Sequence, residues 1–254
     1  MSTYNVFPFK SFIASYANGL GLSNNATTPL TKLDVAAGSI LDSTATFQME
    51  LSASVTIDGA ANGLNGLDTG SLAASKVYSV YLIADPVNLS DVGAIISLSA
   101  TTPLLPFNYS IFAKIGYVVT SGASQFLKGY WTAGNSSLRK FAFDAPQASP
   151  ITVGAATTAT AVVLTTLVPA VDNLPVMLAV DMNPSAASRI LSLTPGNATG
   201  IAAKLTSQVT GVHVTANVEV LSQLVSAVPT VNYLWSAGGG DAVAINVAGY
   251  EFNI

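Results

Sequence analysis

The chain contains one histidine, His213, and no cysteine, so few of its residues can carry chemistry. A histidine that acts as a general base needs a serine and a carboxylate that converge on it. No Gly-x-Ser-x-Gly motif is present. His213 alternates with valines in a run that has the period of a strand, so we expect a surface position and no catalytic role. Thiolate metal sites and multi-histidine metal sites are excluded by composition.

The 13 acidic residues do not form a pattern typical of an active site. A glycosidase needs two carboxyl groups about 5–10 Å apart across a sugar cleft, whereas Asp85 and Asp241 lie beside turn residues and are explained as turn caps. The run 58–68 places oxygen side chains three and four residues apart, but it does not fit a calcium loop. Gly19 and Gly21 lack the third glycine of a dinucleotide motif. We therefore predict no catalytic residue, no cofactor and no metal ligand.

Two short segments concentrate aromatic side chains: Tyr130–Trp131 and Tyr233–Trp235. Exposed aromatic rings in a groove are typical of a carbohydrate-binding module. Strand alternation can bury at least one ring of each pair, so core packing is favoured over sugar binding.

The chain must position these residues on strands, because apolar and polar residues alternate with period two. The clearest run is 212–220, where four polar residues separate five apolar ones. Short runs separated by Gly, Pro and Asn turns favour an all-β fold of two β-sandwich or jelly-roll-like modules. A Pro-rich boundary at 145–150 predicts an N-terminal arm over 1–30, a module over 31–145 and a second module over 146–254. The other expected strands are 31–35, 77–83, 94–98, 111–120, 125–131, 159–164, 176–180, 190–193 and 242–252.

The composition limits the partners. Only 9% of the residues are charged and 50% are hydrophobic, whereas an average domain has about 25% charged residues. A net charge of −4 gives no positive electrostatic potential that would attract the phosphates of a nucleic acid, so nucleic-acid binding is not expected. The sequence has no run of about 20 apolar residues, as a membrane-inserted helix would need. Because interface cores are depleted in charge, we expect a homo-oligomer.

The first residues form the densest aromatic and apolar cluster of the chain. Pro8 and the turn at Asn18-Gly19 exclude a long regular element there. We predict that this arm docks on a sister subunit or on another protein, and the alternative is that it folds back on its own sandwich. The predicted docking residues are Tyr4, Phe7, Phe9, Phe12, Ile13 and Tyr16.

Four segments of the first half resemble a module recurrent in virion proteins of tailed bacteriophages, in particular tail-fibre and other appendage proteins. They are Gly38–Thr44, Asn65–Ala74 followed by Val77–Asp85, Leu98–Pro106 with Tyr109, and Lys114-Ile-Gly116, and the likeness covers about residues 16–131. The family often has an arginine where Lys114 stands, which puts a salt bridge at that position in doubt. The resemblance implies a structural virion protein, most often a trimer, located in the virion after assembly in the bacterial cytoplasm.

The resemblance leaves four functions open. A fibre or a head–tail or tail appendage that docks on other virion proteins comes first, with contact to a host surface glycan or receptor as a further role. A capsid decoration (cement) protein is its closest rival, and copy number per particle separates the two. A polysaccharide depolymerase and a carbohydrate-binding module follow, and we expect no enzyme.

Overall fold

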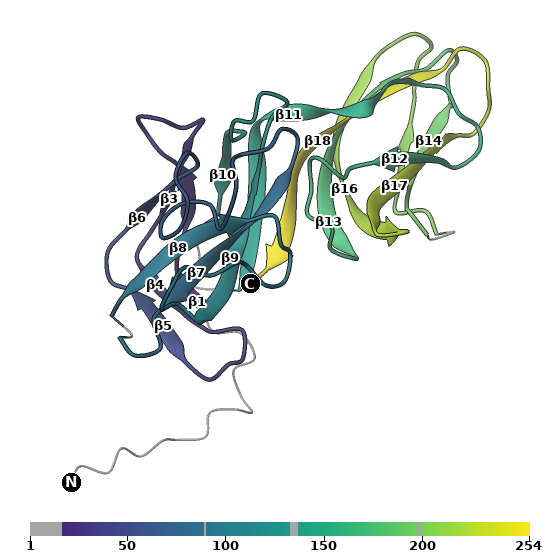
Figure 1. Ribbon diagram of the computed structural model, residues 1–254. Helices are drawn as coiled ribbons and strands as arrows, with labels where there is room; N and C mark the ends of the chain where they lie inside the picture. The colour runs from purple at the N-terminus through teal and green to yellow at the C-terminus, as the bar shows by residue number, and fades with distance from the viewer. Residues whose placement is uncertain (1–16, 89, 133–136, 198–199) are drawn as a thin grey trace.

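The computed structural model describes residues 17–88, 90–132, 137–197 and 200–254, and for residues 148–150 it describes the backbone alone. The described residues form strands and no helix, which confirms the all-β prediction. None of them therefore belongs to a helix that could cross a membrane. Figure 1 shows two lobes, with the N-terminal half of the chain in one and most of the C-terminal half in the other.

The first lobe packs three groups of antiparallel strands around one core. One sheet has the order β1-β4-β5 and a second has the order β8-β7-β9, while β10, β2, β3 and β6 form one end of a long sheet. Apolar side chains from all three groups meet in a single cluster, which includes Leu33, Met49 and Val80. The strands are β1 (Ala17–Gly19), β2 (Leu22–Asn24), β3 (Lys32–Val35), β4 (Gly38–Leu41), β5 (Gln48–Leu51), β6 (Val55–Asp58), β7 (Val77–Ala84), β8 (Val92–Ser97), β9 (Ile111–Val119) and β10 (Gly129–Trp131).

The second lobe is a sandwich. One sheet has the order β16-β13-β18-β11, and β15, β14, β17 and β12 form the other. Alternate residues of β13, such as Val176, Leu178 and Val180, are buried against the second sheet. The strands that belong to this lobe alone are β12 (Thr160–Val163), β13 (Leu174–Asn183), β14 (Ile190–Pro195), β15 (Ala203–Thr206), β16 (Val214–Val225) and β17 (Val228–Trp235).

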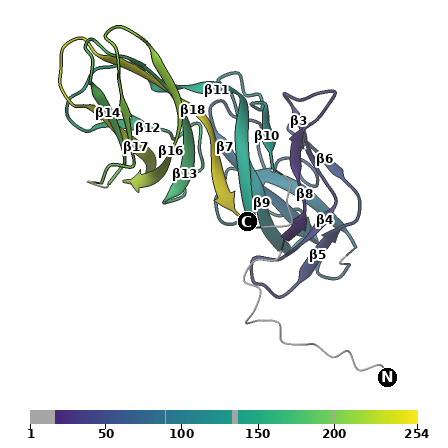
Figure 2. The same ribbon diagram turned by 180° about the vertical axis from the view of Figure 1, so that it is seen from behind.

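Two long strands, β11 (Leu138–Gly154) and β18 (Ala242–Asn253), run through both lobes as an antiparallel pair. Figures 1 and 2 both show them passing from one lobe to the other. Their register is irregular between the lobes, where Ala142 pairs with Gly249 but Gln147 pairs with Val247. The extra residues of β11 form a bulge, which lets one strand pair serve two cores.

An aromatic cluster lies where the long pair crosses the first lobe. Phe141 contacts Tyr250, with ring centroids 5.2 Å apart, and Tyr117 packs edge-on against Phe252 at the same centroid distance. Burying aromatic rings contributes more than any other side-chain class to a core. The crossing point is therefore a packed core and not a flexible link.

Two expected boundaries differ from the structure. The segment 145–150 lies inside β11, so the chain passes between the lobes on a strand. Residues 17–24 of the expected arm form β1 and β2, and Ala17, Leu20 and Leu22 are buried in the first core. These residues pair with β4 and β3 and so belong to the first lobe, and the docking role of the arm stays a prediction. The ranges 31–145 and 146–254 as independent folding units stay predictions.

Candidate functional site

The predicted docking residues Tyr4, Phe7, Phe9, Phe12, Ile13 and Tyr16 lie outside the described residues. Three surfaces of the described part can contact a partner. They are a polar sheet face on the second lobe, a hollow beside Lys114 on the first lobe, and an apolar loop over 98–109.

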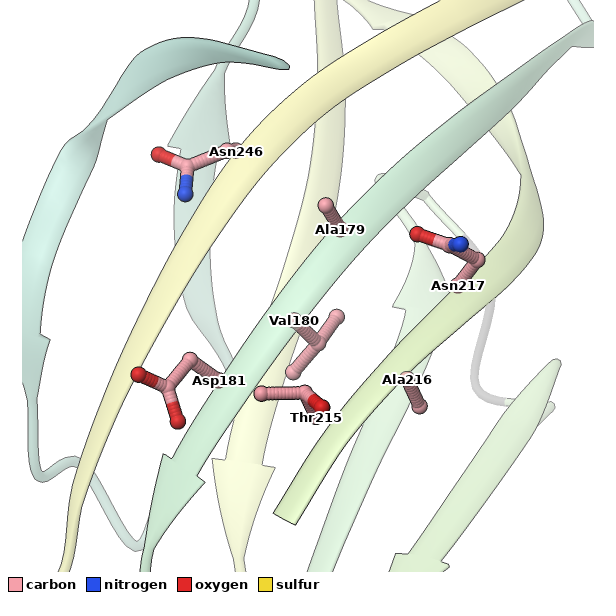
Figure 3. Close-up of a pocket in the computed structure, with 7 residues that line it drawn as sticks. All are labelled: Ala179, Val180, Asp181, Thr215, Ala216, Asn217 and Asn246. Atoms are coloured by element: carbon pink, nitrogen blue, oxygen red, sulfur yellow. The ribbon is translucent and has the colours of Figure 1, made fainter. Parts of the chain in front are cut away.

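The polar face covers three neighbouring strands of the second lobe. Asp181 of β13 pairs with Thr215 of β16, and Ala179 pairs with both Asn217 of β16 and Asn246 of β18. Figure 3 shows these side chains around a shallow hollow of about 280 Å³. Amide and hydroxyl groups over small alanines can hydrogen-bond a partner, but this hollow contains no ring for a sugar to stack on.

His213 precedes β16 and borders this face. Its Nδ1 atom lies 2.9 Å from Oδ1 of Asp181, and both side chains are largely exposed. No serine, threonine or cysteine side chain is recorded as a hydrogen-bond partner of the ring among the described residues. The surroundings are those of a surface pair, as the alternation of 212–220 predicts, and the alternation itself is confirmed because Thr215, Asn217 and Glu219 are exposed.

The second surface is a hollow of about 320 Å³ on the first lobe, lined by Asp42, Lys114, Tyr117 and others. The Lys114 ammonium donates to the Ala100 carbonyl and lies 3.2 Å from the Tyr117 hydroxyl. It also lies 5.1 Å from the centre of the Tyr117 ring, within the range of a cation–π contact. Burial lowers the pKa of Lys114 and raises the pKa of Tyr117 to about 12.

Lys114 makes no ion pair with any described carboxylate. Neutral oxygens and aromatic rings take the place of the salt bridge that the resemblance put in doubt. The ammonium is therefore part of the packing between β9 and the loop after β8.

The turn that contains Asp42 borders this hollow. Burial alone would raise the pKa of Asp42, but hydrogen bonds from the amides of Phe47, Thr46 and Thr44 and from the Thr44 hydroxyl lower it below the ordinary value. The amides of Phe47 and Thr46 lie 2.7 and 2.6 Å from Oδ1 of Asp42. Asp42 thus holds the β4–β5 turn, and its carboxylate is fully used by the turn itself.

The third surface is the loop between β8 and β9, residues 98–109, which we call the apolar loop. Its inner side is anchored: Leu105 and Tyr109 pack against a small cluster formed by Tyr81, Ile83 and Ile95 on the outer face of β7 and β8. Its outer side exposes Phe107 to 91% and Leu104 to 63%. Exposed apolar side chains that are grouped in this way are typical of a protein contact.

Hydrogen bonds fix the apolar loop in this position. The Tyr109 hydroxyl donates to Asp91 at 2.7 Å, and the Leu104 amide donates to Asp68 at 3.1 Å. Burial, the hydrogen bond to Asp91 and the charge of that carboxylate together raise the pKa of Tyr109 to about 12. The loop is held from both ends, so it presents Leu104 and Phe107 without a large ordering cost on binding.

The remaining candidates have structural partners. In the run 58–68, Asp58 pairs with Lys32 at 3.0 Å and Asp68 accepts from Ser97, and the described residues contain no cluster of potential metal ligands. The expected core packing of the aromatic pairs is confirmed: Tyr233 and Trp235 are buried, and Trp131 packs on Phe141. Tyr130 is exposed and hydrogen-bonds to Asp144.

The apolar loop is a contact surface that was not predicted from the sequence. Its signal was the segment Pro103-Leu-Leu-Pro-Phe107, in which two prolines prevent strand pairing of an apolar run. Such a run must either join a core or remain exposed. The fold sends Leu105 inward and Leu104 and Phe107 outward.

The chain matches no protein-family model and no curated protein sequence. Among solved structures it is similar to a chain of infectious bursal disease virus, Gx strain, with 13% identity, a TM-score of 0.25 and coverage of 93% of this chain and 70% of that one. It is also similar to an exo-beta-1,3-galactanase from Phanerochaete chrysosporium, with 11% identity, a TM-score of 0.21 and coverage of 93% and 57%. Both TM-scores lie below 0.5, so neither likeness carries an argument about function.

Proposed function

We propose that this chain is a structural protein of a bacteriophage virion, a fibre or a head–tail or tail appendage component that associates with copies of itself and with other virion proteins. The single observation that carries the proposal is the apolar loop, which is held rigidly and exposes Phe107 and Leu104. A solitary protein gains nothing from ordering such a surface. A subunit that is covered by a neighbour gains about 1.5–3 kcal/mol for each large side chain buried.

The low charge of the chain supports the same function. With 9% charged residues, most of the surface can be desolvated at small cost, because few ionised groups must lose water. The buried carboxylates of Asp241 and Asp42 are compensated: Asp241 forms an ion pair with Arg189, and Asp42 accepts hydrogen bonds from the amides of its own turn. The trimer implied by the family resemblance, the virion location and contact with a host glycan or receptor belong to this proposal, as does the absence of an enzymatic role.

The test removes the apolar side chains of the loop in the full chain. The double variant Leu104→Ser with Phe107→Ser should weaken self-association or incorporation into the particle by roughly a hundredfold to ten-thousandfold, because burial of two large side chains is lost. Val87→Ser is the matched control, since Val87 is 93% exposed in a different loop. Normal incorporation of the double variant, with an unchanged oligomer mass, would contradict the proposal.

Counting copies of the chain in the assembled particle completes the test. A few tens of copies or fewer support an appendage. Hundreds of copies distributed over the head would instead assign the chain to capsid decoration.

A further inference from the structure

The edge of the second lobe formed by β16 is open. Residues Val214 to Ser222 of β16 pair with β13 on one side. On the other side only Gln223 to Val225, at the end of the strand, pair with β17. Among the described residues no strand covers the remaining edge, so one row of backbone donors and acceptors faces outward.

This edge has a single one of the devices that usually protect an edge strand, the charged side chain of Glu219. The β13–β16 register runs without a bulge from Leu174 with Ser222 to Met182 with Val214. The nine residues from Val214 to Ser222 include no proline and no lysine, and their inward-facing positions hold valines, Ala216 and Ser222. A long, regular and apolar edge is a template for the addition of another strand.

The inward face of the edge is also incompletely covered. Val214, Ala216 and Val218 are only half-buried, in contrast to Val220 at 2% exposure. The opposing strand β15 contributes Ala203 and Leu205, which are likewise half-buried. The sandwich is therefore open between β15 and β16, and an added strand would close it.

We propose that the β16 edge pairs antiparallel with β16 of a second copy of this chain, about a two-fold axis at Ala216. In this register His213 lies opposite Glu219 of the other copy, and Thr215 lies opposite Asn217 of the other copy. On the inward face Val214 lies opposite Val218 of the other copy. Each contact occurs twice, because the pairing is symmetric.

Charge and polarity select this partner and this register. Glu219 is the only charged residue of β16 between Val214 and Val225, and His213 is the only histidine of the chain. The register places these two groups opposite each other, pairs an amide with a hydroxyl, and sets valine against valine. His213 already contacts Asp181 of its own chain, so the register is selected by Glu219: registers centred on Asn217 or Val218 would place Glu219 opposite Thr215 or Asn217, with no basic group opposite it.

Pairing also continues the polar face of Figure 3 from one copy into the next, because Thr215 and Asn217 stand on its margin. The strands β16-β13-β18-β11 would then continue into their counterparts of the second copy as one sheet. The inference goes beyond the proposed function and concerns a different surface from the apolar loop. In a trimeric protein the pairing would join two trimers edge to edge.

The absence of native cysteine makes the register directly testable in the full chain. Ala216→Cys places two thiols opposite each other on the axis, at the 4.5–5.5 Å Cβ separation of cross-strand neighbours. Under mild oxidation this variant should give a disulfide-linked dimer. Asn217→Cys is the matched control one residue away, and it should give roughly tenfold less dimer because its partner thiol lies outside the ~7 Å Cα limit.

Because Ala216 is half-buried, Ala216→Cys could fail to fold, so a second pair of variants tests the same register at exposed positions. Thr215 and Asn217 are exposed, so Thr215→Cys and Asn217→Cys should not disturb the core. An equimolar mixture of the two should form the mixed disulfide in preference to either homodimer. The proposal is overturned if the mixture shows no such preference. It is also overturned if folded Ala216→Cys remains monomeric on a non-reducing gel. A monomeric result would include the case in which a different protein pairs with the β16 edge.

Discussion

Gly249 is a position where a single added methyl group should destabilise the fold. It pairs with Ala142 on β11 and with Met177 on β13, in the middle of three strands. An added Cβ would lie 2.2 Å from the Phe141 carbonyl oxygen and 2.3 Å from Cε of Met177. The methionine end can move aside, but the carbonyl oxygen belongs to the backbone of a paired strand and cannot.

We therefore expect Gly249→Ala to lower the free energy of unfolding by about 1–3 kcal/mol, the usual range for overpacking. For a chain of this size, each kcal/mol lowers Tm by about 2–4 °C. Gly200→Ala is the control, because a Cβ there meets no atom within 4 Å. It should change stability by less than about 0.5 kcal/mol.

The assay is urea unfolding followed by the fluorescence of a single tryptophan. The chain has two tryptophans: Trp131 belongs to the first lobe and Trp235 to the second. With either one replaced by phenylalanine, the other reports on its own lobe. Because β18 is shared by both lobes, Gly249→Ala should shift both transitions by the same amount.

Two results would refute this reasoning. One is a Gly249→Ala midpoint equal to that of the parent protein. The other is a shift confined to one lobe, which would mean that the long strand pair does not couple the two cores.

Further predictions concern the turn at Asp42, the tryptophans and the N-terminus. Asp42→Asn should lower stability at neutral pH by about 1–3 kcal/mol, since hydrogen bonds to an ionised acceptor are lost. Because the pKa of Asp42 is lowered in the folded state, the difference should shrink as the pH of the unfolding experiment falls below 3.8, the ordinary value. With Trp131→Phe, the emission of Trp235, which is 1% exposed, should resist acrylamide quenching, and quenching as strong as for free tryptophan would contradict its burial. Deletion of residues 1–15 should leave a β-type circular dichroism spectrum but abolish incorporation into the particle, whereas an unfolded product would assign these residues to the core.

Alternation in the sequence predicts much of the fold. The runs at 77–83, 111–120 and 242–252 coincide with β7, β9 and β18 to within one residue at each end. In these strands one face or both faces are buried, so the spacing of the hydrophobic residues is enough to predict where each strand begins and ends.

Turns explain several strands that the sequence does not reveal. The β16–β17 hairpin turns at Ser226 and Ala227, which have φ values of 51° and 66°. Such turns normally require Asn or Gly, and Pro229 argues further against a strand. Hydrogen bonding between the flanking strands compensates for the backbone strain at this turn. The sequence around the turn gives no sign of that hydrogen bonding, so the turn could not be predicted from it.

The candidate surfaces were harder to predict than the strands. The surroundings of Lys114 come from Tyr81, Ala100 and Tyr117, which meet only after the sheet β8-β7-β9 has formed. The open edge of β16 depends on which strand lies beside it, and a sequence pattern does not specify neighbours. Exposure of the apolar loop likewise follows from the position of the cluster beneath it.

The strand pair β11–β18 also determines how the molecule bears mechanical load. Tension applied between the lobes along these strands acts parallel to them, so many backbone hydrogen bonds share the force and must fail together. The irregular register between Ala142 and Gln147 is the largest of three interruptions of that row, and the others lie between Ala148 and Ile151 and between Ile151 and Gly154. Extension under force should therefore begin at the largest interruption, with the two lobes separating slightly before either one unravels.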